Sequence, residues 1–116
     1  MTIATNVQKE TLAAAYAGAA VYASLHTATP GSTGASEVTG GSPAYARKAV
    51  TWTAGGSDGV YTGTCTFDVP TGITITHGGL WTAVTAGTFL DGGALAASQA
   101  FSAQGTYVLT ITYTQL

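Results

Sequence analysis

The sequence has few charges and a single cysteine. Charged residues make up 7% of its 116 residues, against roughly 25% in a typical globular chain. Its cations are Lys9, Arg47 and Lys48, whereas a nucleic-acid-binding surface needs several lysine or arginine contacts to neutralise phosphates. Cys65 has no second cysteine to pair with, which excludes an intrachain disulfide. We therefore expect neither a nucleic-acid partner nor a fold that depends on disulfides.

The chain also lacks an apolar run long enough to cross a membrane. Residues 12–23 are rich in alanine and glycine but interrupted by polar residues, and they fall short of the about 20 residues that a transmembrane helix needs. Lys9 and Glu10 precede this stretch, which is unlike a secretory signal peptide. We expect a chain that is made in a cytoplasm and has no membrane partner.

A surface with so little charge repels copies of itself only weakly, and the net charge is −2. Two interpretations remain open. Either much of the surface is packed against other subunits in a permanent assembly, or hydroxyl groups keep a free monomer soluble. The first interpretation predicts a protein that works as part of an assembly.

What the sequence does contain is threonine, glycine and short alternating apolar segments. Threonine is β-branched and favours strands. Alternation at a period of two, interrupted by glycine-rich turns at roughly ten-residue spacing, is typical of antiparallel sheets. The segments with this pattern are 21–27, 45–52, 60–67, 73–77, 80–84, 94–101 and 106–113, with turns at 55–59, 68–72, 91–93 and 102–105. We predict a mainly β fold, an antiparallel β-sandwich or compact barrel of about seven or eight strands.

Residues 72–90 form the stretch around which this prediction is organised. Ile73, Ile75 and His77 are expected on one face of a strand. Gly78 and Gly79 are expected to form a bulge or a tight bend. The strand then resumes over 80–84, and residues 85–87 are predicted to turn the chain.

One helix is predicted, over residues 1–20. Thr5 followed by Gln8 fits a capping box, the alanine-rich run favours a helix, and Gly18 is expected to end it. The organisation predicted is one domain, 1–116, with a helical segment 1–20 and a β-domain 21–116. The long glycine-rich and proline-punctuated loop 28–43 is expected to contact a partner, because loops of this length in small domains usually have a function.

No constellation of residues predicts a metal site or a cofactor site. The two histidines, His26 and His77, could share a metal with Asp68 or Asp91. No short-range ligand spacing supports this, and packed histidines are the simpler interpretation. Glycine pairs such as Gly40-Gly41 are not followed by the helix start and the lysine that a phosphate-binding loop requires.

No combination of residues predicts a catalytic site. Ser24, His26 and Asp58 can be combined into a triad on paper, but no nucleophile-elbow sequence surrounds the serine. Cys65 shares a predicted strand face with Tyr61 and Phe67, so a buried thiol is expected and not a nucleophile. We expect no catalytic residues and no enzymatic activity.

Two surface features leave alternatives open. Arg47 and Lys48 could protect a strand edge from mispairing or contact a carboxylate of a partner. Six aromatic residues could form a sugar-binding shelf, although aromatics at alternate strand positions usually belong to the core: Tyr22, Tyr45, Trp52, Trp81, Tyr107 and Tyr113.

Three segments in a fixed order resemble a family of small tailed-phage and prophage proteins, mostly tail fibre or minor structural proteins. They are residues 21–31 (VYASLHTATPG), 37–47 (EVTGGSPAYAR) and 76–81 (THGGLW), followed by 87–90 (GTFL) and 93–95 (GAL). The similarity covers about residues 21 to 95. The family commonly has aspartate where Thr29 stands and often a larger apolar residue where Gly79 stands, departures that we expect to affect local loops.

This resemblance implies a non-enzymatic component of a phage virion, with no catalytic, metal-binding or cofactor-binding residues to carry over. The leading expectation is a capsid decoration protein, a homotrimer that stabilises the head by binding the major capsid protein lattice. The alternative is a tail-fibre or minor tail protein that contacts the host surface and other tail proteins. A carbohydrate-binding module is the third hypothesis.

Overall fold

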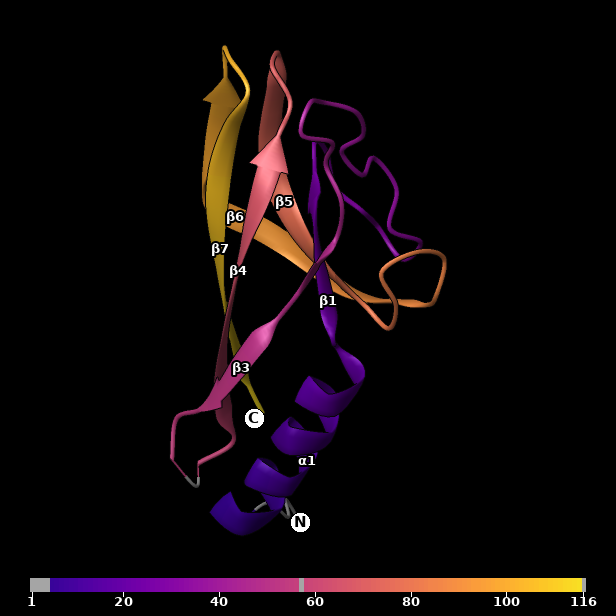
Figure 1. Cartoon of the computed structure of the whole chain (residues 1–116). Coiled ribbons are helices and arrows are strands. Elements are labelled where there is room, and N and C mark those ends of the chain that lie inside the picture. The colour runs from indigo at the N-terminus through magenta and orange to yellow at the C-terminus, as the bar shows by residue number, and fades with distance from the viewer. Residues whose placement is uncertain (1–4, 57, 116) are drawn as a thin grey trace.

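The computed structural model describes residues 5–56 and 58–115. Within them the chain forms one helix and seven strands, joined into two antiparallel sheets (Figure 1). The elements are α1 (Asn6–Ala19), β1 (Tyr22–His26), β2 (Lys48–Ala49), β3 (Thr51–Ala54), β4 (Val60–Val69), β5 (Ile73–Trp81), β6 (Phe89–Phe101) and β7 (Gly105–Thr114). The predicted mainly β fold with antiparallel sheets and a short N-terminal helix is confirmed.

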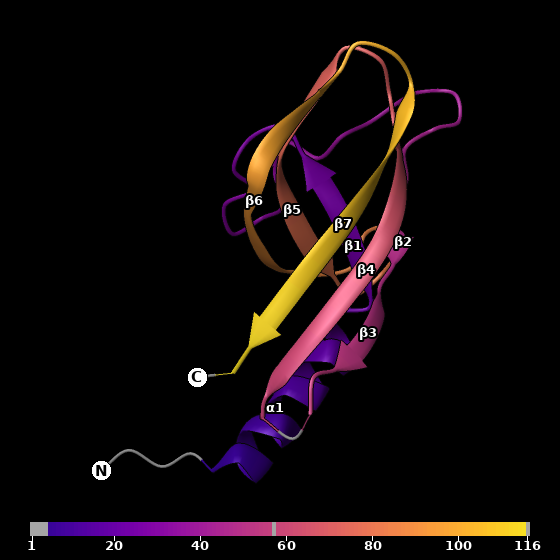
Figure 2. The same cartoon turned by 90° about the vertical axis from the view of Figure 1, so that its left-hand side faces the viewer.

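The strand order leaves one side of the sandwich open. The first sheet has the order β2-β1-β5-β6 and the second has the order β3-β4-β7. The chain passes from β2 to β3 across Val50, so the two sheets are joined along that side. On the opposite side β6 and β7 are both last strands, and they diverge from their connecting turn (Figure 2). The molecule is elongated, with extents of 50 × 24 × 21 Å.

The core lies between the sheets and follows the period of two that the sequence predicted. In β4 the residues Cys65, Phe67 and Val69 are buried, while Thr66 between them is exposed and Asp68 is half-buried. Leu25 from β1 and Ile75 from β5 are fully buried in the same cluster. Apolar area removed from water along these alternating faces is the main stabilising contribution to a fold of this kind.

The helix begins as predicted and packs through alanines. The Thr5 hydroxyl accepts a hydrogen bond from the backbone N–H of Gln8 at 3.3 Å, which caps the N-terminus. Ala13 and Ala17 are the buried helical residues, so the contact with the sheets is close and small. The helix ends at Ala19 and not at Gly18. The first four residues of the predicted helical segment lie outside the described residues. In the described part of the chain, no helix has the length and apolar character needed to cross a membrane.

Two predictions about β5 were wrong. β5 continues as one strand through Gly78 and Gly79, which pair regularly with β6, and the register shifts lie on either side of them, at Ile75/His77 and at Leu80/Trp81. A bulge between Ile75 and His77 places His77 opposite His26, away from the core face that holds Ile75. Across this irregularity β5 advances by two residues while its partners in β6, Gln99 and Ala94, are five residues apart, so the alternation expected from the sequence does not continue from Ile75 to His77.

The predicted strand boundaries also shifted in three places. The turn expected at 91–93 belongs to β6, which pairs with β5 from Phe89 onward. The strand expected over 45–52 is divided between β2 and β3, one in each sheet. Residues 82–84 lie after the end of β5 and form part of the 82–88 loop.

Candidate functional site

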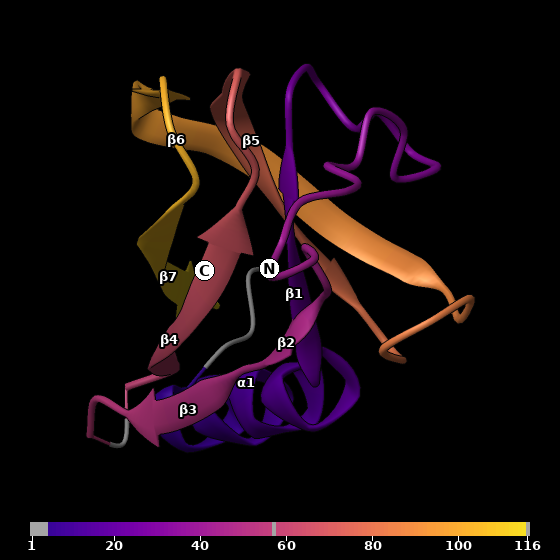
Figure 3. The same cartoon turned by 45° about the horizontal axis from the view of Figure 1, so that its top comes forward.

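The structure gathers the family-like segments into one network on the outer face of the first sheet. The segment 27–47 crosses this face and lies on the same side of the molecule as the 82–88 loop (Figure 3). Beneath it, Ser24 and His26 of β1 are completely buried, although they point away from the core residues Ala23 and Leu25. We call this network, made of Ser24, His26, Glu37, Tyr45, Arg47 and Trp81, the loop clamp.

A continuous chain of hydrogen bonds forms the base of the loop clamp. The indole N–H of Trp81 donates to the Ser24 hydroxyl at 2.9 Å. The Ser24 Oγ lies 2.7 Å from His26 Nε2, and His26 Nδ1 lies 2.7 Å from the carbonyl oxygen of Ala35. Because a carbonyl only accepts, Nδ1 carries the proton and the Ser24 hydroxyl donates to Nε2. Every donor therefore has an acceptor, and burial lowers the pKa of His26 so that the ring is neutral.

The structure does not bring together the three residues that were considered for, and rejected as, a catalytic triad. Ser24 and His26 do come together, but both are buried beneath the 27–47 segment. The Nδ1 atom that an aspartate would orient is bonded to the Ala35 carbonyl. Asp58 instead accepts from the backbone N–H of Val60 at 3.1 Å, in the turn before β4. The arrangement fixes a loop and does not present a nucleophile to solvent.

The two histidines lie opposite one another in the β1–β5 pairing. His77 Nδ1 lies 2.8 Å from the hydroxyl of the neighbouring Thr76. Asp68 and Asp91 do not join them: Asp68 faces Lys48, and Asp91 binds Tyr16. Among the residues that the structure describes, no group of three or more histidine, cysteine, aspartate or glutamate side chains could hold a metal ion.

Arg47 is the centre of the upper half of the loop clamp. Its guanidinium forms a two-point ion pair with Glu37, with N–O distances of 3.0 Å for both Nε to Oε2 and Nη2 to Oε1. The guanidinium carbon also lies 3.4 Å from the centre of the Trp81 ring, a cation–π contact. Arg47 Nη1 donates to the carbonyl oxygens of Ala83 and Ala86, at 3.2 and 2.8 Å. One side chain thus holds three segments of the chain together.

Tyr45 ties the loop clamp to the core. Its hydroxyl donates to Glu37 Oε2 at 2.9 Å and accepts from the backbone N–H of Leu25 at 3.0 Å. Its ring stacks on Phe67, with 6.0 Å between ring centres. Burial raises the pKa of Tyr45, so the hydroxyl stays protonated and keeps donating to the carboxylate.

Two glycines make room for this network. Gly34 has a φ of +78°, and a Cβ placed there would collide with the Trp81 ring. A Cβ at Gly79 would collide with Ser24 Oγ and His26 Nε2. We had expected a change at Gly79 to affect a local loop. Instead Gly79 lies within β5, against the chain of hydrogen bonds. A larger residue at this position requires that chain to rearrange.

The neighbouring cation and the cysteine have simpler roles. Lys48 Nζ lies 4.0 Å from Asp68 Oδ2, and both side chains are about one-third exposed, so this is a loose surface pair. Cys65 is buried as expected, and burial raises its pKa to about 11, which keeps the thiol protonated near neutral pH.

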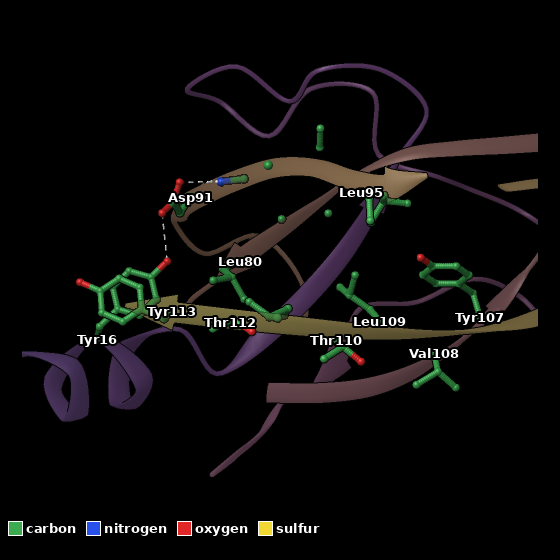
Figure 4. A pocket seen from close by; sticks show the side chains of 17 residues that line it. Tyr16, Leu80, Asp91, Leu95, Tyr107, Val108, Leu109, Thr110, Thr112 and Tyr113 are labelled. Atoms are coloured by element: carbon green, nitrogen blue, oxygen red, sulfur yellow. Dashed lines mark hydrogen bonds between the residues drawn. The ribbon is translucent and has the colours of Figure 1, made fainter. Parts of the chain in front are cut away.

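A second feature is an apolar cleft on the open side of the sandwich, with a volume of about 500 Å³. We call it the β6/β7 cleft. Its walls are formed by Leu80 and Leu95 on the first sheet and by Leu109 and Ile111 on the second (Figure 4). Leu109 is buried, while Leu95 and Ile111 are only half-buried. The interior of the sandwich is therefore accessible from this side.

One end of the β6/β7 cleft is closed by a pair of stacked tyrosines. The rings of Tyr16 and Tyr113 are parallel within 11°, with 3.8 Å between their centres. The Tyr16 hydroxyl donates to Asp91 Oδ2 at 3.1 Å, which links α1 to β6 (Figure 4). Burial, followed by the charge of Asp91, raises the pKa of Tyr16. The two walls of the cleft are therefore tied together at this end.

The six aromatic residues considered for a sugar-binding shelf do not lie together. Trp52 and Tyr113 both contact Tyr16, near the cleft. Tyr45 packs on the core, and Trp81 is 7% exposed beneath Arg47. Burial and hydrogen bonding use most of these rings as packing elements.

Sequence reasoning missed Glu37 and the covered state of Ser24, whereas His26 is packed as the sequence indicated. The signal for Glu37 was present, because it is one of only five acidic residues and precedes Arg47 by ten positions. Nothing local indicated that the polar face of β1 would be covered, since that depends on where the 27–47 segment folds back.

Comparison with known protein families identifies the family to which the chain belongs. Residues 4–116 match the family model described as "Podophage GP4 fiber I protein gp80". No curated protein matches the chain. Because the match spans nearly the whole chain, the protein belongs to this family and is a structural protein of a bacteriophage virion.

Proposed function

We propose that this member of the podophage fiber I protein family is a non-enzymatic subunit of a virion fibre at the phage tail. The observation that carries the proposal is the combination of a fibre-named family with an elongated sandwich whose long side is uncovered along two strands. A fibre subunit works through contacts with its neighbours, so its function lies in surfaces and not in a reactive site. We also propose that it acts as a homo-oligomer; the trimer expected from the sequence remains part of this proposal.

The loop clamp supports this role. A fibre must keep its shape while it is exposed to solvent and to mechanical load. Arg47 joins the 27–47 segment to the 82–88 loop through an ion pair, a ring contact and two carbonyl hydrogen bonds. The two longest irregular segments of the β-domain are thereby held to the sheet, which gives a rigid module with few mobile loops.

Capsid decoration, the leading expectation from the sequence, is the second candidate. The observation that favours it is the exposed apolar surface of α1, where Val7 is 74% exposed and Leu12 is 44% exposed. Exposed apolar side chains such as these could lie against the major capsid protein. In either location the partners are virion proteins.

The location can be tested on purified particles. We expect antibody or gold labelling of the chain to mark the tail and not the head, and image reconstruction to place density of about 50 Å length there. Labelling spread over the head would favour decoration and overturn the fibre proposal. Absence from washed particles would overturn both.

The carbohydrate-binding alternative needs its own test. Glycan-array binding by the folded chain, lost in Trp52→Ala, would support it, because Trp52 is the more accessible tryptophan. Trp81→Ala serves as the matched control, since Arg47 covers that ring. The fibre-subunit proposal does not require either result.

A further inference from the structure

We propose that the open side of the sandwich is where copies of this chain pair. The β6 edge of one copy would hydrogen-bond to the β7 edge of the next, and the neighbouring copy would close the β6/β7 cleft. This inference deepens the proposed function and rests on it, because a fibre requires repeated contacts between like subunits.

The two edges are long and uncovered. β6 and β7 each occupy the last position of a sheet, so alternate backbone N–H and C=O groups of each strand point away from the sheet. β6 has 13 residues and β7 has 10, whereas a typical strand has about five or six. None of the β6 residues is buried, and only Phe89, Leu95 and Phe101 are half-buried. Strands of this length and exposure are templates for another strand.

Apart from an irregularity in β6, the usual protections against such pairing are missing. Between Phe89 and Thr114 the sequence contains no lysine, arginine, glutamate or proline, and Asp91 is the one acidic residue. β6 does bend: Ile75 and His77 are two residues apart, while their partners Gln99 and Ala94 are five apart. In the described part of the chain, no strand pairs with the outer side of β6 or β7, so both edges are open to another strand.

A second copy is the occupant that this chemistry favours. An almost uncharged surface neither repels a copy of itself nor selects a partner of opposite charge. Every copy carries two uncovered edges beside one cleft, and pairing β6 with β7 covers both of them. Pairing β6 with β6, or adding one foreign strand, leaves an edge exposed. Pairing of unlike edges gives a two-fold pair or a ring where the rotation between copies closes, and an open filament where it does not.

The area is sufficient for a stable contact. At about 3.3 Å per residue, β6 is roughly 43 Å long. With a molecular thickness of 21 Å, the open side measures roughly 900 Å², against about 800 Å² per partner in a stable interface. The half-buried Leu95 and Ile111 in the cleft supply apolar area that only a neighbour can cover.

Charges placed on the two edges test the pairing directly. The first variant carries Ala94→Lys, Ala100→Lys, Val108→Lys and Thr112→Lys, all at exposed positions of β6 and β7. The second carries the same β6 changes with Val108→Glu and Thr112→Glu. With two charges on each edge, at least one charge on β6 lies within about 10 Å of one on the neighbouring copy's β7 in most registers of pairing. This is about the range over which charges interact in dilute salt.

The oligomeric state of the full chain is then measured by sedimentation or light scattering, from ~1 to ~100 µM. We expect the wild type to be oligomeric and the all-lysine variant to dissociate with at least about a tenfold weaker association. The lysine–glutamate variant should stay oligomeric, because lysine then meets glutamate across each β6–β7 contact. If β6 paired with β6, lysine would meet lysine and both variants would dissociate, which would overturn the proposal.

The matched control is Thr51→Lys with Thr53→Lys. These threonines are exposed on β3, in the second sheet but at its opposite edge, and they should leave association unchanged. Circular dichroism and thermal unfolding of all variants check that dissociation does not come from unfolding. A folded variant set that associates like the wild type would also overturn the proposal.

Failure here can be told apart from failure of the proposed function. A monomeric wild type at ~100 µM overturns the pairing even if labelling finds the chain on tails. If such a monomer loses particle incorporation in the all-lysine variant, the cleft binds another virion protein. An oligomer with the expected variant pattern that is absent from particles keeps the pairing and removes the fibre role.

Discussion

Removing the guanidinium of Arg47 should destabilise the protein far more than removing the charge next to it. The substitution Arg47→Met keeps most of the apolar stem and deletes the ion pair with Glu37, the contact with the Trp81 ring and two hydrogen bonds to loop carbonyls. The Arg47 and Glu37 side chains are 11% and 19% exposed, so the carboxylate left behind is poorly solvated.

The magnitude follows from three contributions. Losing one partner of a buried ion pair costs about 3–5 kcal/mol, which partial exposure of this pair reduces. The cation–π contact adds about 0.5–2 kcal/mol, and Tyr45 still donates to Glu37 and offsets part of the loss. We expect about 3 kcal/mol in total, which lowers the Tm by about 12 °C for a chain of this length.

The assay is thermal and urea unfolding followed by circular dichroism and tryptophan fluorescence. Lys48→Met is the matched control, because its pair with Asp68 spans 4.0 Å and both partners are about one-third exposed. It should cost less than about 1 kcal/mol. Arg47→Lys should fall between the two, since lysine keeps the charge without the fork geometry.

A double-mutant cycle with Glu37→Gln isolates the ion pair itself. We expect a coupling free energy between Arg47 and Glu37 of about 1–3 kcal/mol. If Arg47→Met and Lys48→Met lower stability equally, or if the coupling is near zero, the loop clamp does not hold the loops in the way we describe.

Three further predictions follow from buried groups. Because burial lowers the pKa of His26, the unfolded chain takes up this proton first as the pH falls below about 6.5. Stability should therefore fall toward acid pH with up to about 1.4 kcal/mol per pH unit from this residue, and urea unfolding of His26→Gln should show a shallower dependence; an unchanged one would contradict the assignment. Gly34→Ala should cost about 2 kcal/mol or more from the collision with Trp81 and the φ of +78°, whereas Gly31→Ala, at a φ of +61° with open space around it, should cost only about 1 kcal/mol. Equal costs at the two glycines would argue against tight packing on the tryptophan. Cys65, with its pKa raised to about 11, should react with iodoacetamide at pH 8 many times more slowly in the folded chain than in urea, and equal rates would show that the thiol is accessible.

The alternation of apolar residues was enough to predict which faces of the strands form the core. Cys65 and Phe67 in β4, and Leu109 in β7, are buried on the face that the period of two indicated. The helix start at Thr5 was equally readable, because a cap depends on residues three positions apart. The family itself was recognised from short motifs in a fixed order.

The same reasoning failed where the register between neighbouring strands decides which face a residue occupies. The register shift between Ile75 and His77 accompanies the placement of His77 on the outer face, and glycines 78 and 79 pair regularly within β5. Residues 91–93 became part of β6 because β5 offered them partners. A strand's boundaries depend on its neighbour across the sheet, which local sequence does not contain.

Sequence alone therefore determined the elements of this protein: threonine-rich strands with one apolar face and a capped helix. Tertiary structure decided which of those elements are covered. The polar face of β1 became buried only because the 27–47 segment folds over it and Arg47 fastens it there. β6 and β7 were left uncovered only because the strand order puts both at the open side. Local sequence sets the face that a side chain occupies, whereas the packing of segments distant in sequence sets what, if anything, lies on that face.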